Sequence, residues 1–300
     1  VDIGKGHLTS LSRENNIDEF ISFSANIEGY GSTSTSFVGA SITDFDFYTA
    51  VDLWFTDQPL AEATWGLIGD WNVSAVTNMS SAFYPSRSLA VRNDFNEDIS
   101  AWDVGSVTDM SYMFYNATSF NQPLNWDTSS VTNMVAIFSG ATSFNQPLNW
   151  NTSSVNSMTS MFYQAIAFDQ TLNFDTSSLV SMSGMFDTAT SFNSTLTFSD
   201  TSSVTDMSYM FHKATAFNQP LNWDVSSVIN MELMFYQAYA FNQPLNWNTS
   251  SVATMRQMFL QATSFNQPLN WNTSSVTNMV DMFYQAIAFD QTLNWDTSSV

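Results

Sequence analysis

No cysteine occurs in the sequence, and residues that carry positive charge are few. The 300 residues include six Lys and Arg against 27 Asp and Glu, which gives a formal net charge of −21. Without cysteine, disulfides, thiolate metal sites and cysteine nucleophiles are excluded, but the compartment stays open because a stacked core needs no covalent staples. The shortage of Lys and Arg argues against nucleic acid and anionic lipid as partners, since positive side chains supply most of the affinity for both.

Long apolar runs are also missing. Because a membrane-spanning helix needs about 20 consecutive apolar residues, we expect no direct membrane insertion. Catalytic signatures such as G-x-S-x-G, the P-loop, HExxH and G-x-G-x-x-G do not occur either. Of the two histidines, His7 and His212, the second stands where other units have Tyr, which predicts an exposed variant position rather than a general base. We therefore expect no enzyme activity, no catalytic residue, no cofactor and no dedicated metal site.

What the sequence does contain is a repeat of 24 residues, with one unit of 25. Trp71 begins an earlier unit that is longer, at 31 residues. A period in this range is typical of solenoids, in which each unit is too small to close its own core and stacks on its neighbours. The repeat is marked by an aromatic residue at Trp102, Trp126, Trp150, Phe174, Phe198, Trp223, Trp247, Trp271 and Trp295.

Within one unit the spacing of the apolar residues changes along the chain. The first apolar residues after Trp102 have the spacing of one helical face, namely Val107, Met110, Met113, Phe114 and Ala117. Leu124 and Trp126 then alternate with Asn125 and Asp127, as in a strand. We predict a leucine-rich-repeat-like solenoid, in which each coil has one short parallel β-strand and one helical or 3₁₀ segment, with an N-terminal cap. An added residue in the Phe198 unit, Ser199 or Asp200, predicts a bulge.

Three segments follow from this reading. Residues 1–42 are expected to be a strand-rich N-terminal segment or the end of a preceding domain. Residues 43–70 are expected to form a capping helix region, with a helix from Thr43 to Phe55 that Thr43 caps and that covers the apolar end of the first coil. Residues 71–300 are expected to form about nine coils of a solenoid that continues beyond residue 300.

The polar residues of the predicted strands form two outward columns. One interpretation is structural, because stacked amides can hydrogen-bond along a column. The other is a face that binds glycans or proteins, made by Asn125, Asp127, Asn149, Asn173, Asn222, Asp224, Asn246 and Asn270. Carboxylate and amide oxygens suit Ca²⁺, but no calcium-loop signature occurs, so we expect only weak, diffuse Ca²⁺ binding. Candidate N-glycosylation sites, read from N-x-S/T sequons, are Asn72, Asn116, Asn151, Asn193, Asn248 and Asn272.

The sequence of the repeat is similar to that of a known family. The stretch from Ala50 to Phe83, with "WNVSAVTNM", and the stretch from Trp102 to Trp126, with "WDVGSVTDM" and "SFNQPLNW", resemble BspA-type leucine-rich-repeat surface proteins. The variant that they most resemble occurs in mycoplasma lipoproteins as a domain of unknown function. The resemblance implies a secreted or surface location and roles in adhesion, matrix binding or aggregation, and it implies no catalytic activity.

These patterns predict an extracellular or surface-exposed structural or adhesive repeat protein. In one mechanism it assembles with other copies of itself into a fibre or sheath. The alternative is an adhesion module that binds surface glycans or proteins through the polar Asn/Asp strand face. We expect no nucleic-acid partner.

Overall fold

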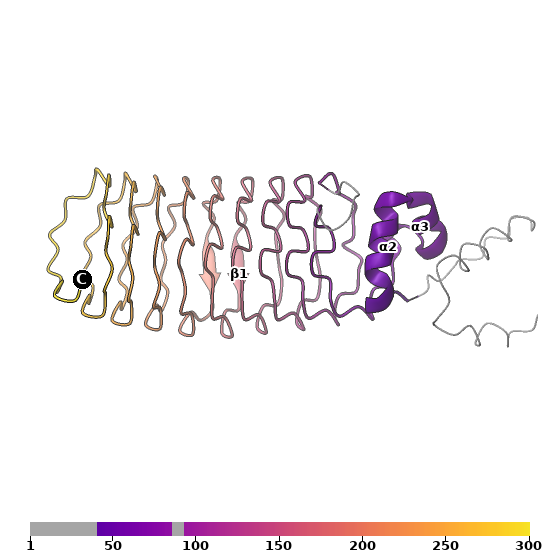
Figure 1. The fold of residues 1–300 in the computed structure, drawn as a ribbon, viewed down its shortest axis with the longest axis horizontal. Helices are drawn as coiled ribbons and strands as arrows, with labels where there is room; N and C mark the ends of the chain where they lie inside the picture. Colours follow the sequence, from indigo (N-terminus) through magenta and orange to yellow (C-terminus); the bar gives the residue numbers. More distant parts are fainter. Residues whose placement is uncertain (1–40, 86–92) are drawn as a thin grey trace, which may run out of the picture. The chain divides into compact units, whose positions relative to one another are not determined.

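The computed structural model describes residues 41–85 and 93–300. The chain divides into two compact units, Val1–Val38 and Gly39–Val300, and every described residue belongs to the second. Its elements are the helices α2 (Asp44–Thr56) and α3 (Gln58–Trp65), the 3₁₀ helix η2 (Ile68–Asp70), and the strands β1 (Leu172–Phe174) and β2 (Leu196–Phe198). Figure 1 shows α2 and α3 followed by a series of coils that lie side by side. The segment predicted for residues 1–42, with His7, lies outside the described residues except for Ser41 and Ile42.

Helix α2 occupies the range in which the sequence predicts a helix. Thr43 is its N-cap residue, but the Thr43 hydroxyl donates to Asp46 Oδ2 at 2.8 Å and caps no backbone amide. The carboxylates of Asp44 and Asp46 suit the positive end of the helix dipole in the first turn. The buried residues of the helix share one side, and they are Phe47, Ala50, Val51 and Trp54.

Asp57 separates the two helices. Its backbone leaves the helical region at the end of α2, and its Oδ1 accepts the amide of Leu60 in the first turn of α3 at 3.2 Å. Gly66 ends α3 with a φ of 84°, a left-handed value that glycine adopts without a Cβ clash. Among the described residues, no helix has the length and apolar character that crossing a bilayer would require.

The coils are joined by a parallel backbone ladder. Isolated parallel bridges link residues one coil apart, such as Asp109 and Asn133. Beyond this bridge, the amides of Met110, Tyr112, Phe114 and Asn116 donate to carbonyls of the next coil at 2.7–3.1 Å. The amides between them close turns inside their own coil instead. Successive backbone amides therefore bond alternately to the next coil and to a turn within their own coil.

The prediction of a helical segment in each coil is wrong. No described residue after Asp70 is helical. In a typical coil two residues four apart have left-handed backbones, as at Tyr112 (φ 57°) and Asn116 (φ 56°). Such residues interrupt a right-handed helix and suit the third position of a type II turn. Consecutive turns thus return side chains to the interior at the same spacing that a helix would give.

The strand predicted in every coil is present in only two of the described coils. Strands β1 and β2 pair in parallel, with Leu172 opposite Leu196 and Phe174 opposite Phe198. In most of the other described coils the tryptophan makes the link between neighbours. The indole N–H of Trp150, for example, donates to the carbonyl of Leu124 in the preceding coil at 2.9 Å. Equivalent bonds of 2.7–3.1 Å are made by Trp102, Trp126, Trp247, Trp271 and Trp295.

The two strands belong to the two neighbouring coils in which phenylalanine stands in place of the usual tryptophan. Phe174 and Phe198 have no indole N–H, so they cannot make this bond. There the backbone pairs instead, with the amide of Leu172 donating to Thr195 and the amide of Ser199 donating to Phe174, both at 3.1 Å. The added residue of the 25-residue unit is taken up at Ser199, directly after β2, where the backbone bends.

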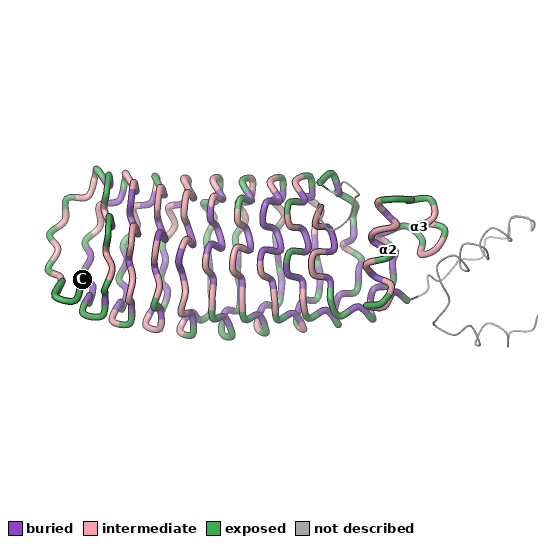
Figure 2. Tube along the Cα trace, viewed as in Figure 1, coloured by how far each residue is buried: buried purple, intermediate pink, exposed green. Residues whose placement is uncertain are grey.

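The interior consists of stacked aromatic columns, and Figure 2 shows how buried positions alternate with exposed ones along successive coils. Phe114 and Phe120 pack within one coil, with ring centroids 4.1 Å apart. Across coils, the rings of Phe114 and Phe138 are 5.5 Å apart and those of Trp126 and Trp150 are 6.3 Å apart. Both pairs are nearly parallel, at 4°. Each coil therefore closes its core on its neighbours, as a repeat of this length must.

At the first coil, α2 takes the place of a preceding coil. Asp44 accepts the Thr77 amide at 2.7 Å through Oδ1 and the Thr77 hydroxyl at 2.6 Å through Oδ2. One coil later, the amide and hydroxyl of Thr108 donate to the carbonyl of Thr77 instead, at 2.8 and 3.2 Å. The Asp44 carboxylate thus substitutes for a backbone carbonyl. Apolar contact is made by Trp54, whose ring lies 6.1 Å from that of Trp71.

Candidate functional site

The predicted binding face points outward. Its residues, from Asn125 and Asp127 to Asn246 and Asn270, are exposed on either side of buried Leu and Trp. The structural interpretation of this column, a ladder of hydrogen-bonded amides, is wrong. Within residues 93–300 these Asn side chains form no hydrogen bond with one another. The members of this free Asn column are Asn125, Asn149, Asn173, Asn222, Asn246 and Asn270.

A different Asn column links the coils. The amide of Asn145 donates to Oδ1 of Asn121, one coil earlier, at 2.9 Å. Gln146 follows it and donates through Nε2 to the carbonyl and Oδ1 of Asn121, both at 3.1 Å. The linking column consists of Asn96, Asn121, Asn145, Asp169, Asn193, Asn218, Asn242, Asn266 and Asp290. The recurrent Asn-Gln dipeptide before Pro-Leu was the sequence signal for this column, and the sequence analysis missed it.

The threonines that directly follow the Asp/Asn column are buried and also link coils. The hydroxyl of Thr128 donates to the carbonyl of Asn151 in the next coil at 2.8 Å, and Thr152 repeats this contact with Asp175. Thr201 occupies the same place in its coil and donates to Asp224 at 2.8 Å. Because of the added residue at Ser199, Asp200 therefore joins the Asp/Asn column between Asp175 and Asp224.

The Asp/Asn column closes turns. Oδ1 of Asp127 accepts the amide of Ser129 at 3.0 Å, a geometry in which a side chain satisfies the backbone two residues on. Hydrogen bonding by the serine two residues further along lowers the pKa of Asp127, Asp175, Asp200, Asp224 and Asp296 below the ordinary value. For Asp200 the neighbouring charges of Asp224 and Asp175 oppose this effect without reversing it.

These acids do not form a metal centre. In the described ranges, no three or more His, Cys, Asp or Glu side chains come together as ligands for a metal ion. Diffuse Ca²⁺ binding stays a prediction.

A shallow depression lies between two coils of the predicted binding face. Its volume is about 210 Å³. It is lined by Leu245, Asn246, Trp247, Asn270 and Trp271. It brings two members of the free Asn column next to the buried indole rings of Trp247 and Trp271.

His212 is not the exposed position that the sequence predicts. Its side chain is 16% exposed, and Nδ1 lies 2.6 Å from Oδ1 of Asp187 in the preceding coil. The hydroxyl of Thr188 donates to the same Asp187 oxygen at 2.8 Å. On the other side, the ring of Tyr236 stacks at 4.8 Å. The Asp187–His212 pair replaces two tyrosines of the repeat with a polar link between coils.

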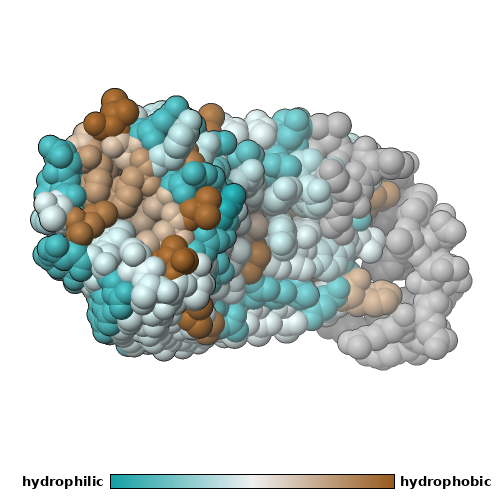
Figure 3. All heavy atoms as spheres, turned by 60° about the vertical axis from the view of Figure 1, so that its left-hand side comes forward, coloured by the Kyte–Doolittle hydropathy of each residue, from teal (hydrophilic) through white to brown (hydrophobic). Residues whose placement is uncertain are grey.

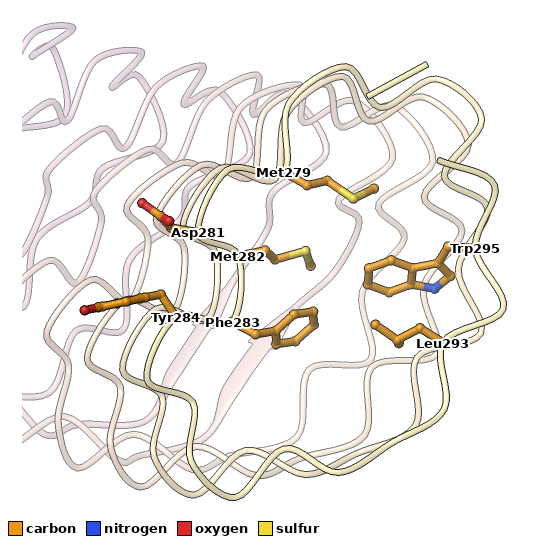
Figure 4. Close-up of a pocket in the computed structure, with 7 residues that line it drawn as sticks. All are labelled: Met279, Asp281, Met282, Phe283, Tyr284, Leu293 and Trp295. Atoms are coloured by element: carbon orange, nitrogen blue, oxygen red, sulfur yellow. The ribbon is translucent and has the colours of Figure 1, made fainter. Parts of the chain in front are cut away.

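The last coil leaves apolar side chains uncovered. Figure 3 shows apolar atoms gathered on this end of the stack, surrounded by hydrophilic ones. A cavity of about 380 Å³ opens there. In Figure 4 the side chains of Met279, Met282 and Phe283 point toward those of Leu293 and Trp295, whereas Asp281 and Tyr284 point away from them.

The six candidate glycosylation sites are all exposed. Five of them use Oδ1 as an acceptor within the protein. Oδ1 of Asn193 accepts the amide of Asn218 as part of the linking column. A serine amide two residues on is accepted by Asn72, Asn151, Asn248 and Asn272. Asn116 has a left-handed backbone and stands beside Gly140 in the next coil.

Comparison with known proteins gives one match. The sequence profile of the family described as "Mycoplasma protein of unknown function, DUF285" matches residues 49–174, 148–246, 170–267 and 221–300. The four matches overlap, as expected where one profile fits a repeat in several registers. No curated protein and no solved structure matches the chain.

Proposed function

Because the chain belongs to the DUF285 family of mycoplasma proteins of unknown function, we propose that it is a structural or adhesive protein of an exposed cell or particle surface. We assign the fold to leucine-rich-repeat-like solenoids. We assign the chain to the BspA-type group, which its repeat sequence resembles. The observation that carries the proposal is the continuous link between coils. Backbone, Asn, Thr and Trp hydrogen bonds recur at the same positions in successive coils, so the polar groups of the repeat serve the stack.

A stack of this kind supports an adhesive role through its surface. Its long faces repeat the same side chains at a fixed distance, and contacts too weak to hold singly gain strength when several act together. The net charge of −21 keeps such a surface soluble. The free Asn column offers one contact surface, because its amides are exposed and are not engaged in the stack.

Surface labelling tests the location. We would treat intact cells or particles of the source with a specific antibody, and with a protease that cannot enter them. Labelling and cleavage before lysis are the expected results. Labelling that appears only after lysis would refute the proposed location. The control is a known internal protein, detected with its own antibody, which should be labelled and cleaved only after lysis.

Assembly of several copies into a fibre or sheath is the second candidate, and the regular repetition of side chains along the coils favours it. Successive coils stack their rings in the same way at each step, as Phe259 and Phe283 do with ring centroids 5.6 Å apart. Electron microscopy of the native protein tests this. Regular fibres support assembly, and single short rods at high concentration contradict it.

A further inference from the structure

Three tyrosines lie together in the first two coils. The rings of Tyr84 and Tyr115, one coil apart, have centroids 4.9 Å apart and are nearly perpendicular, at 88°. The ring centroid of Tyr112 lies 5.7 Å from that of Tyr115. Among the described residues, these are the only pairs of tyrosine rings in contact with each other. We call the three residues the tyrosine cluster.

The repeat places tyrosines in adjacent coils at this position only once in the described residues. Tyr84 and Tyr115 each directly follow a buried phenylalanine of the core. In the later coils the same position is occupied by Ser139, Tyr163, Asp187, His212, Tyr236, Leu260 and Tyr284. No two consecutive coils of this later series both carry tyrosine there. The close pair therefore belongs to the start of the stack, next to the coil that α2 covers.

The core fixes the two points from which these rings project. The ring of Phe83 stacks on that of Phe114 with centroids 5.4 Å apart, and the amide of Phe83 donates to the carbonyl of Met113 at 2.9 Å. Tyr84 and Tyr115 follow these phenylalanines directly, so each phenol is one residue away from a contact that joins the coils. Holding two groups at such a distance replaces a bimolecular encounter by an intramolecular one.

The phenols of the cluster are accessible and uncommitted. Tyr112 is 42% exposed, and Tyr84 and Tyr115 are half-buried. None of the three hydroxyls makes a hydrogen bond within residues 41–85 and 93–300. The ring of Tyr236, by contrast, is stacked against His212 with centroids 4.8 Å apart. An oxidant in solution can therefore reach the cluster.

We propose that Tyr84 and Tyr115 form a site of oxidative cross-linking, at which a peroxidase-type oxidant joins the two rings as dityrosine. Because the chain has no cysteine, no disulfide can join its coils. The tyrosine bond takes that role and ties the first coil, which contacts α2, to the second.

The reaction balances with hydrogen peroxide as the oxidant. Each phenol loses one electron and one proton, which gives two tyrosyl radicals. The radicals couple through ring carbons ortho to the oxygens, so that one C–C bond forms. One C–H bond of each ring then breaks as its proton moves to the phenol oxygen and the ring becomes aromatic again. The two electrons and two protons reduce one peroxide to two molecules of water.

Trypsin gives a direct readout, because Arg87 and Arg92 stand between the two tyrosines in the sequence. Cleavage after Lys and Arg leaves Tyr84 in the peptide 14–87 and Tyr115 in the peptide 93–213. The native protein is treated with a haem peroxidase and hydrogen peroxide, and the monomer band of a denaturing gel is digested. We expect one species with the summed mass of both peptides less two hydrogens, and fragmentation should place the link at Tyr84 and Tyr115.

Conservative variants test the assignment without removing a ring. Tyr84→Phe and Tyr115→Phe should each abolish the linked species, since phenylalanine has no phenol to oxidise. Tyr163→Phe is the matched control, because Tyr163 holds the same position in a later coil and lies in the same tryptic peptide as Tyr115. This variant should leave the yield unchanged. Unfolding the protein before oxidation should lower the yield by about tenfold or more.

Three results overturn the inference: no linked species in the treated wild type, a link that persists in Tyr115→Phe, and an equal yield from unfolded protein. The role of the bond is tested by urea unfolding. The linked protein should have a midpoint higher by roughly 1 M than Tyr84→Phe treated in the same way, because the bond restricts the unfolded chain. Equal midpoints would refute its role as a tie between coils.

Discussion

Replacing Asn242 by alanine should weaken the stack, whereas replacing Asn246 should not. The two asparagines stand four residues apart in one coil. Oδ1 of Asn242 accepts the amide of Asn266 at 2.9 Å and Nε2 of Gln267 at 3.0 Å, both from the next coil. Asn246 is exposed and belongs to the free Asn column. The comparison therefore separates an amide that holds coils together from one that faces solvent.

The expected loss follows from these contacts. Asn242→Ala leaves the half-buried Asn266 amide without its acceptor and removes one of two bonds to Gln267, so unfolding should become easier by about 2 kcal/mol. With a slope of about 3 kcal/mol per molar urea, this lowers the urea midpoint by roughly 0.7 M. Asn246→Ala should change stability by no more than about 0.5 kcal/mol, as for other exposed positions.

Urea unfolding followed by tryptophan fluorescence measures both variants under one set of conditions. Asn242→Asp is a third variant, because Asp169 occupies the equivalent position and its Oδ1 accepts the Asn193 amide at 2.9 Å. This change should cost less than alanine. Equal midpoints for Asn242→Ala and Asn246→Ala would refute the distinction between the two columns.

Three further predictions concern the cap, the tryptophans and a glycine. Burial raises the pKa of Asp44, but hydrogen bonds from the Thr77 side chain and from the amides of Thr77 and Asn78 outweigh it, so the pKa lies below the ordinary 3.8. Since a lowered pKa means that the folded state favours the charged form, this stabilisation is present above about pH 4 and is lost as the pH falls through the folded value. Asp44→Asn should therefore lower the melting temperature at pH 7. The difference in melting temperature between the wild type and this variant should become smaller in acid, and a difference that stays constant with pH would contradict this. Trp150→Phe should lose about 1 kcal/mol in urea unfolding with the bond to Leu124, and an unchanged midpoint would show that the indole N–H is dispensable. Gly140→Ala should destabilise the protein more than Gly184→Ala in the same assay. Both glycines have left-handed backbones, at φ 72° and 61°, but a Cβ on Gly140 would lie 2.0 Å from Asn116 Oδ1, whereas the nearest atom at Gly184 is 3.3 Å away. Equal losses would show that Asn116 moves aside freely.

The spacing of apolar residues fails to identify the local structure of a coil because it reports only which side chains face inward. Val107, Met110, Met113, Phe114 and Ala117 are all buried, as the sequence predicts. A helix and a series of turns bury the same set. The choice between them rests on left-handed backbones at residues such as Tyr112, Gln164 and Leu233, which are not residue types that favour this region and so give no signal in the sequence.

The role of the linking asparagines is hard to read from the sequence for a related reason. Asn121 and Asn125 recur with the same period, and the Asn-Gln dipeptide marks the position of Asn121 without revealing its partner in the next coil. Which of them reaches the next coil depends on the direction of the backbone at each point of the turn. The tryptophan link is similar, since the sequence marks Trp150 as an interior residue but does not reveal that its N–H replaces a strand hydrogen bond.

By itself the sequence determined the 24-residue period, the aromatic interior, the outward direction of the Asn/Asp columns and the position of α2. These features depend on burial alone, which residue type and spacing encode directly. The tertiary structure decided which polar groups join the coils, that turns replace helices, and that Asp44 closes the first coil. Each of these depends on how residues one coil apart are placed, and that placement exists only once the coils have stacked.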